Sequence, residues 1–196
     1  INIKGADKDL TILNAQNTGR GFTIIRSAYN VISDLTITGG NSESSNINPW
    51  AGGGIYALHS DHVYLNNLKI YANNAIDGGG IYNVFGYMRT THVDIFNNVA
   101  TNYGGGVYLV GTISIFLDTN VKANTSGNYG GGMYFENTYP LFMQVTIANN
   151  SATNGGGGFY LTGEAGGVTG AGLTNPLLLN FTLANNTAPI GDGFFY

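Results

Sequence analysis

A five-residue tract, Gly-Gly-Gly-x-Tyr with an apolar residue at x, occurs five times in this sequence at a constant interval. The copies begin at positions 52, 78, 104, 130 and 156, so each starts 26 residues after the one before. A fixed period of this length is typical of a chain in which one structural unit is repeated and stacked. Because each unit then packs only against its neighbours, this tract constrains the fold more than any other feature.

A second marker, an aliphatic residue followed three places later by Asn, keeps the same period. Its copies are Ile70-x-x-Asn73, Ile95-x-x-Asn98, Val121-x-x-Asn124, Ile147-x-x-Asn150 and Leu183-x-x-Asn186. The interval between copies is longer before the last copy of both markers, and it is longer again where the pattern is extended toward the N-terminus. Insertions that preserve the phase on both sides are loops on a regular scaffold. We therefore predict insertion loops at 41–51 and 163–176.

Between the markers the sequence consists of short β-branched or aromatic runs, separated by Gly, Asn, Asp, Ser and Thr. Such runs are typical of strands, and no window carries a helical pattern. A propeller blade would need four antiparallel strands in about 40 residues, and a leucine-rich repeat would need its own Leu spacing. Two or three strands per repeat match one coil of a parallel β-solenoid. We predict that residues 1–196 form a single all-β domain of this kind.

Stacked coils place equivalent residues about 4.8 Å apart, in columns. The apolar residue x is expected to point inward, and the Tyr after it to form an outer or edge ladder. The glycines allow a bend or a close approach, and the asparagines are expected to stack at a turn, with left-handed φ and amide bonds from coil to coil. The structural positions of the repeat are Gly54, Tyr56, Gly80, Tyr82, Gly106, Tyr108, Gly132, Tyr134, Gly158, Tyr160, Asn73, Asn98, Asn124, Asn150 and Asn186.

The two markers together resemble the repeat of the polymorphic outer-membrane proteins, whose motifs are Gly-Gly-Ala-Ile and Phe-x-x-Asn. The resemblance covers about residues 70–195, with Gly in place of Ala at positions 54, 80, 106 and 132, and Ile, Val or Leu in place of Phe. The stretches at 10–15 and 35–40 resemble the wider pectin-lyase-like superfamily. The resemblance implies a right-handed parallel β-helix, here of about seven coils, with a passenger or surface role. It implies no activity, since function on such a fold resides in individual sites.

Composition excludes several classes of function. Lysine and arginine total 7 and the net charge is -4, so the chain has no basic stripe for nucleic acid. No run of 18 apolar residues exists that could span a membrane as a helix. Neither end carries a polar cap, so we expect a segment of a longer protein, or stacking end to end with other β-helix segments or copies of itself. These features favour a structural or adhesive role, extracellular or at a cell surface, including an extracellular filament.

An enzyme acting on polysaccharide is the alternative on the same fold. A hydrolase needs paired carboxylates, and a lyase needs a base with Ca²⁺ ligands. The eleven acidic residues do not gather at one repeat phase. The best cluster consists of His59, Asp61, His62, His92 and Asp94. We interpret it as scattered loop residues. Arg89 could serve as a base only if acidic residues flanked it, and none is near in sequence. No catalytic residue, cofactor or metal site is predicted.

Carbohydrate binding without cleavage is a third hypothesis. Stacked tyrosines can present flat rings to sugars, and Trp50 in the first insertion loop is a candidate contact. Four Asn-x-Ser/Thr sequons begin at Asn124, Asn149, Asn180 and Asn185. These asparagines either occur because turns of an Asn-rich repeat favour Asn, or they are sites of N-glycosylation in a secretory pathway.

Overall fold

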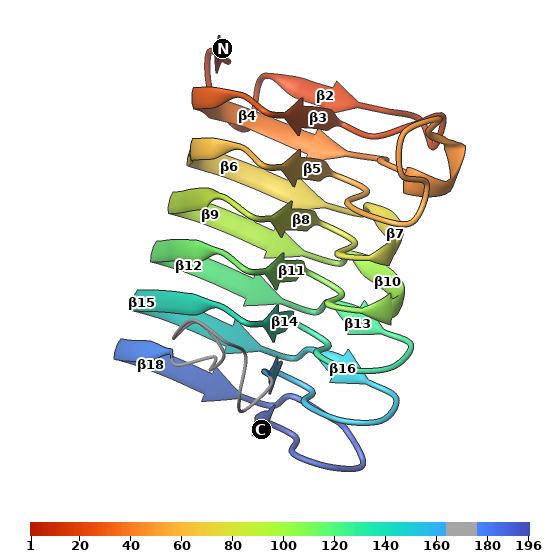
Figure 1. Ribbon diagram of the computed structural model, residues 1–196, viewed down its shortest axis with the longest axis vertical. Helices are drawn as coiled ribbons and strands as arrows, with labels where there is room; N and C mark the ends of the chain where they lie inside the picture. Colours follow the sequence, from red (N-terminus) through yellow and green to blue (C-terminus); the bar gives the residue numbers. More distant parts are fainter. Residues whose placement is uncertain (164–175) are drawn as a thin grey trace.

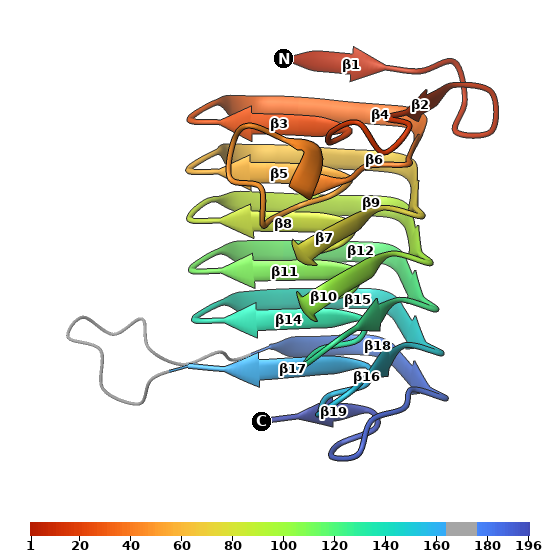
Figure 2. The ribbon, with the colours of Figure 1, turned by 90° about the vertical axis from the view of Figure 1, so that its right-hand side faces the viewer.

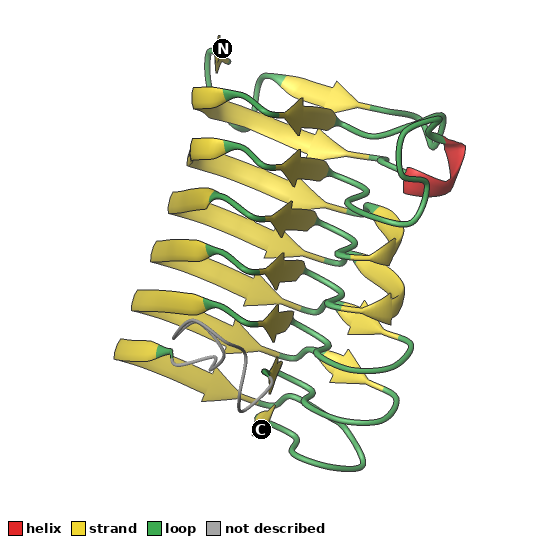
Figure 3. Cartoon of the chain, in the orientation of Figure 1, coloured by secondary structure: helices red, strands yellow, loops and turns green. Residues whose placement is uncertain are grey.

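The chain is a β-solenoid built from parallel sheets, as a computed structural model shows (Figure 1). The structure describes residues 1–163 and 176–196, so the insertion predicted at 163–176 lies almost wholly outside the described residues. Within the described part, the one helical turn is η1 (Ser42–Ser44), in the first insertion (Figure 3). The predicted all-β, parallel β-helix fold is confirmed, with about six turns where about seven were predicted.

The strands of the solenoid form three sheets, which we call the long, short and lateral sheets (Figure 2). The long sheet contains β1 (Asn2–Lys4), β2 (Ile12–Asn14), β4 (Ala28–Thr38), β6 (Asp61–Tyr71), β9 (Tyr87–Phe96), β12 (Ile113–Lys122), β15 (Tyr139–Ala148) and β18 (Leu177–Ala184). The short sheet contains β3 (Phe22–Ile25), β5 (Ile55–Leu58), β8 (Ile81–Val84), β11 (Val107–Val110), β14 (Met133–Glu136), β17 (Phe159–Thr162) and β19 (Phe194–Phe195). The lateral sheet contains β7 (Asn74–Asp77), β10 (Val99–Tyr103), β13 (Thr125–Ser126) and β16 (Ser151–Ala152). No helix in the described residues is long and apolar enough to cross a membrane.

The core fills the space between the long and short sheets. On the short sheet it consists of the residues at position x of the glycine tract, Ile55, Ile81, Val107, Met133 and Phe159, each at most 2% exposed. On the long sheet it includes the aliphatic residues of the second marker, such as Ile70, Ile95 and Ile147. Equivalent residues pair in register from coil to coil, for example Val107 with Ile81 and Met133. The two sequence markers therefore line opposite walls of one continuous core.

Six strands of the long sheet, β4, β6, β9, β12, β15 and β18, have eight to eleven residues and are longer than the short runs expected from the sequence. Each of these six strands continues through one residue with left-handed φ, and these residues form a column: Asp34, Asn67, His92, Asp118, Gln144 and Asn180. The ladder resumes in register on either side, as at Ser33 with Asn66 and Leu35 with Leu68. The left-handed residue restarts the alternation of inward and outward side chains. As a result, every second residue faces the core both before and after the bend.

The asparagines of the second marker form a buried ladder at the corner between the long and lateral sheets. Asn98 Nδ2 donates to Ile70 O at 2.9 Å and to Asn124 Oδ1 at 3.0 Å, and the backbone amide of Asn98 donates to the same Oδ1. These are the amide bonds between coils that the sequence analysis expected. The left-handed φ was placed wrongly: it belongs to the residue before each asparagine, Ala72, Asn97, Ala123, Asn149 or Asn185. That residue turns the chain, which lets the asparagine point inward.

The tyrosines of the glycine tract form a ladder that ends on Phe195, with ring centroids 4.8 to 5.9 Å apart. We expected an outer or edge ladder with rings stacked face over face. The Tyr56–Tyr82, Tyr134–Tyr160 and Tyr160–Phe195 contacts are stacked in this way. The contacts on either side of Tyr108 are edge-to-face instead, and Tyr56, Tyr108 and Tyr134 are buried. The reason is that Tyr103 of the lateral sheet and Tyr129, its partner in the next coil, pack against the ladder.

Candidate functional site

A cleft lies where the N-terminal segment crosses the outer face of the long sheet. The segment between β1 and β2 passes over the bend at Asp34, and a Cβ on Gly5 would lie 2.0 Å from Asp34 O. Only glycine permits this crossing. Thr36 Oγ1 on β4 then donates to the carbonyl of Lys8 at 2.6 Å. This bond fixes the segment over the sheet.

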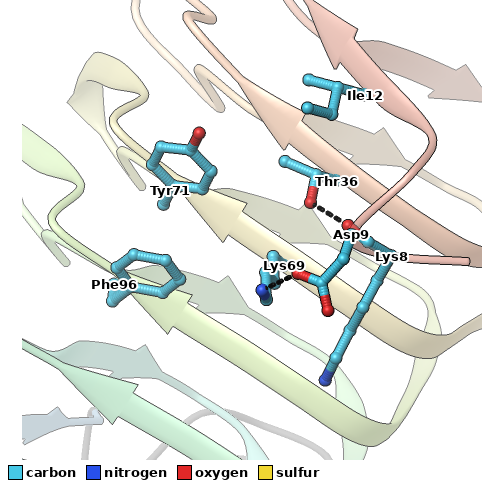
Figure 4. A pocket seen from close by; sticks show the side chains of 7 residues that line it. All are labelled: Lys8, Asp9, Ile12, Thr36, Lys69, Tyr71 and Phe96. Atoms are coloured by element: carbon cyan, nitrogen blue, oxygen red, sulfur yellow. Dashed lines mark hydrogen bonds and ion pairs between the residues drawn. The ribbon is translucent and has the colours of Figure 1, made fainter.

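The cleft encloses about 250 Å³ and is lined by Lys8, Asp9, Ile12, Thr36, Lys69, Tyr71 and Phe96. Figure 4 shows Tyr71 and Phe96 on one side, Ile12, Asp9 and Lys8 on the other, and Thr36 and Lys69 between them. The two rings are stacked, with centroids 4.9 Å apart and planes inclined by 10°. Both rings are partly exposed. One wall of the cleft is therefore aromatic, and the other walls are mainly polar.

Two ion pairs join the N-terminal segment to the long sheet across this cleft. Lys8 Nζ lies 3.2 Å from Asp94 Oδ2, and Lys69 Nζ pairs with Asp9 Oδ1. The hydrogen bond with Asp9 raises the pKa of Lys69, and the charges of Asp9, Asp94 and Asp7 add to this effect. Asp94 also accepts from Asn120 Nδ2 in the next coil at 2.8 Å. The charges in the cleft thus balance, and each lysine already has a carboxylate partner.

Two neighbouring columns of the repeat supply the sheet residues of this site. Thr36, Lys69 and Asp94 are in-register partners, and so are Tyr71 and Phe96. Sequence reasoning did not identify Tyr71 and Phe96 as a pair, although each directly follows the aliphatic residue of the second marker. Alignment of the coils on that marker would have placed the two rings side by side. Lys8 and Asp9 precede the repeat, so no phase predicts them.

The histidine and aspartate cluster weighed from the sequence is not assembled. His59 stacks on Phe85, His62 stacks on Tyr29 beside Asp61, and His92 Nε2 lies 3.1 Å from Asp118. Asp94 instead pairs with Lys8, which lines the cleft. Arg89 is exposed, and its register partner is Tyr64. Over residues 1–163 and 176–196, no three His, Asp or Glu side chains gather in a way that could hold a metal ion.

The other predicted contact residues lie apart from the cleft lining. Trp50 is 61% exposed in the first insertion. Asn124 is fully buried and donates its side-chain amide to Ile95 O and to Asn150 Oδ1, so a glycan at Asn124 is incompatible with this fold. Asn149, Asn180 and Asn185 are exposed and have left-handed φ. Their geometry leaves them accessible to modification.

A second polar cluster lies between the short and lateral sheets, among the tyrosines. Tyr108 Oη donates to Glu136 Oε2 at 2.7 Å, and the backbone amide of Tyr103 donates to Asp77 Oδ1 at 3.2 Å. Burial raises the pKa of Asp77 to about 6. Burial, together with Glu136, also raises the pKa of Tyr108. Because the tyrosine ladder fills this space, we assign the cluster to packing between the sheets.

Comparison of this chain with protein-family models, with curated proteins and with solved structures found no match. Its function must therefore be inferred from the residues and their geometry.

Proposed function

We propose that this chain is a non-catalytic structural or adhesive β-helix, part of an extracellular or cell-surface protein or of an extracellular filament. The observation that carries the proposal is the buried asparagine ladder, which joins Asn73, Asn98, Asn124, Asn150 and Asn186 in one continuous series. The residues that recur from coil to coil are the ones that stack on their neighbours. A rod built in this way holds its outer residues in a fixed and repetitive array, which suits a structural or adhesive surface.

The outer surface and the sequence resemblance support an extracellular location. Only 9% of residues are charged, and the corners are rich in Asn, Ser, Thr and Gly. The resemblance to the repeat of the polymorphic outer-membrane proteins, within the pectin-lyase-like superfamily, adds the expectation of a surface passenger. Sites of N-glycosylation at Asn149, Asn180 and Asn185 would fit the same setting.

An enzyme acting on polysaccharide is the second candidate, because Asp9 and two lysines line the cleft beside aromatic rings, and Asp94 pairs with Lys8. A lyase needs a deprotonated base to abstract a proton. Lys69 does not suit this role, since its pairing with Asp9 raises its pKa and keeps it protonated. The groups in the cleft are arranged to hold one another, which favours binding over cleavage.

Contact with another β-helix coil is part of the proposal. Leu178 of β18 is in register with Phe142, which is fully buried, yet Leu178 is 39% exposed. Phe194 of β19 is likewise in register with buried Phe159 and is 53% exposed. Core columns thus reach the surface at this face. We propose that a coil from a copy of the chain, or from another β-helix segment, covers it.

Immunogold electron microscopy of the source cells tests the location and role. An antibody raised against the folded chain is expected to label the cell surface or extracellular filaments, and labelling confined to the cytoplasm would contradict the proposal. Incubation of the chain with polygalacturonate and alginate, with and without Ca²⁺, is expected to give no product. Turnover of either polymer would establish the enzymatic alternative.

A further inference from the structure

We propose that the cleft under the N-terminal segment binds a neutral sugar ring of a surface glycan. This inference rests on the proposed adhesive function and names the contact through which adhesion would occur. A sugar ring carries C–H groups on its faces and hydroxyl groups at its edge. The cleft offers a matching surface for each.

The aromatic wall supplies the apolar contact. Tyr71 and Phe96 lie on successive strands of the rigid long sheet, stacked at 4.9 Å, and both are partly exposed on the cleft side. Rings fixed on strands lose little conformational freedom when they bind a ligand. An exposed aromatic pair at the wall of a cleft is a typical contact for the apolar face of a ligand.

The ion pairs supply hydrogen-bonding groups for the hydroxyls. Lys69 and Asp9 occupy the floor and the facing wall, and Lys8 is held by Asp94. A hydroxyl can accept from an ammonium group and donate to a carboxylate, so it satisfies both members of such a pair without removing either charge. An anionic sugar would have to compete with Asp9 and Asp94 for the lysines. The balance of charge therefore favours a neutral ligand.

The size of the cleft and its surroundings define how much of a glycan it holds. A volume of about 250 Å³ lies just below the ~300–1,000 Å³ range of pockets for drug-sized molecules, so the cleft suits a terminal ring or a short segment. The same columns continue on β12, where Asn120 is the register partner of Asp94 and Lys122 that of Phe96. A longer glycan would follow these residues along the axis of the solenoid.

Titration calorimetry with neutral oligosaccharides of glucose, galactose, mannose and N-acetylglucosamine, and with oligogalacturonate for comparison, tests the proposal. We expect saturable binding of at least one neutral sugar, little affected by salt. Tyr71→Ala and Phe96→Ala should each weaken it tenfold or more, while Tyr71→Phe, which keeps the ring, should retain it within about threefold. Tyr196→Ala, which removes an aromatic ring that is 75% exposed outside the cleft lining, should leave the affinity unchanged.

The proposal is overturned by three results: no saturable binding of any neutral sugar, binding that both alanine variants retain, or a salt-dependent preference for oligogalacturonate. If an alanine variant fails to fold, chemical-shift changes in the wild-type chain decide instead, and they must centre on Tyr71, Phe96 and Lys69. Surface labelling of cells is unaffected by these outcomes. Labelling at the surface without sugar binding would remove the glycan site and leave the structural role standing.

Discussion

At the level of single residues, the three glycines of each tract are required for different reasons. In the copy at 104–106, Gly104 has a φ of +63°. A Cβ on Gly105 would lie 2.4 Å from Gly131 O and 2.5 Å from Thr125 O, both backbone atoms. A Cβ on Gly106 would lie 2.7 Å from Gly132 O and 3.0 Å from Asn124 Nδ2. The third glycine therefore packs on the asparagine ladder, which explains why the two sequence markers share one period.

Gly105→Ala is expected to destabilise the chain by about 2–4 kcal/mol, because the contacting atoms belong to the backbones of two other segments and cannot move aside. Gly19→Ala is the control, since a Cβ there has no neighbour within 4 Å. It should change the free energy of unfolding by no more than about 0.5 kcal/mol. Urea unfolding followed by circular dichroism measures both, and equal losses would contradict the steric account.

Asn124→Ala should be among the most destabilising substitutions in the chain. It removes the acceptor for the backbone and side-chain amides of Asn98 and the donor to Ile95 O, all in a buried corner. Buried groups left unpaired cost about 1–3 kcal/mol each, so we expect a total loss of about 3–5 kcal/mol. Asn154→Ala removes a bond to Asn128 in an exposed row and should cost less than about 1 kcal/mol. Thermal unfolding of the two variants provides the test.

At the level of elements, one side chain holds the first insertion on the coil. Arg20 donates to Ala51 O and Gly52 O at 2.8 and 3.0 Å and to Ser45 Oγ at 2.8 Å, and it also bonds the carbonyls of Ile47 and Asn48. Its guanidinium lies 4.7 Å from the ring centre of Tyr56. Arg20 therefore fastens the insertion and covers one end of the tyrosine ladder.

Arg20→Lys is expected to release this insertion while the coils stay folded. A single ammonium group cannot replace the planar fork that reaches several carbonyls at once. Limited proteolysis should then cut the variant within residues 43–50, at least tenfold faster than the wild type. Arg26→Lys, at an exposed position, is the matched control and should keep the wild-type pattern. Equal cleavage rates in all three proteins would show that Arg20 does not hold the loop.

Asp77 at the end of β7 makes stability depend on pH. Its pKa of about 6 lies above the ordinary value of 3.8, because burial outweighs the hydrogen bonds from Tyr103 and Asn102, and Glu136 adds a like charge. The folded state therefore holds this proton more tightly than the unfolded state does. The contribution of Asp77 to the free energy of unfolding is fully present below about pH 4 and is lost as the pH rises through about 6. The loss is about 1–2 kcal/mol when it is discounted for partial exposure.

Asp77→Asn should remove this loss, because the amide stays uncharged and its oxygen can still accept from Tyr103. We expect the variant to be more stable than the wild type at pH 7 and equal to it at pH 4. Urea unfolding at pH 4, 5, 6 and 7 measures the difference. Parallel stability curves for the two proteins would show that Asp77 does not carry the pH dependence.

The sequence was sufficient for the elements that the repeat defines. The phase of the glycine tract and of the asparagine marker located the short strands, the inward column and the amide ladder. The bend in the long strands was missed because Asp, Asn, His and Gln all occupy it, so no residue type identifies the column. The cleft was missed because Lys8 and Asp9 pair with residues 86 and 60 positions away, outside the periodic part of the chain.

At the level of the whole molecule, the solenoid is stabilised by columns that each coil extends by one residue. On the long sheet, the core column through Phe116 and Phe142 continues to Leu178. On the short sheet, the core column through Met133 and Phe159 continues to Phe194. A residue of such a column is fully buried only where one coil lies before it and another lies after it. Leu178 and Phe194 therefore expose an apolar face next to the free backbone groups of edge strands, which favours pairing with another coil.

Leu178→Lys combined with Phe194→Lys is expected to weaken self-association of the chain, because two charges would have to enter a core column when a second coil stacks on this face. Sedimentation velocity from 1 to 100 µM should show a concentration-dependent increase in mass for the wild type, and a dissociation constant at least about tenfold higher for the double variant. Leu10→Lys, at an apolar position that is 79% exposed outside these columns, serves as the control and should associate like the wild type. A wild-type chain that stays monomeric over this range would exclude stacking of copies and would leave coils of another β-helix segment as the partner of this face.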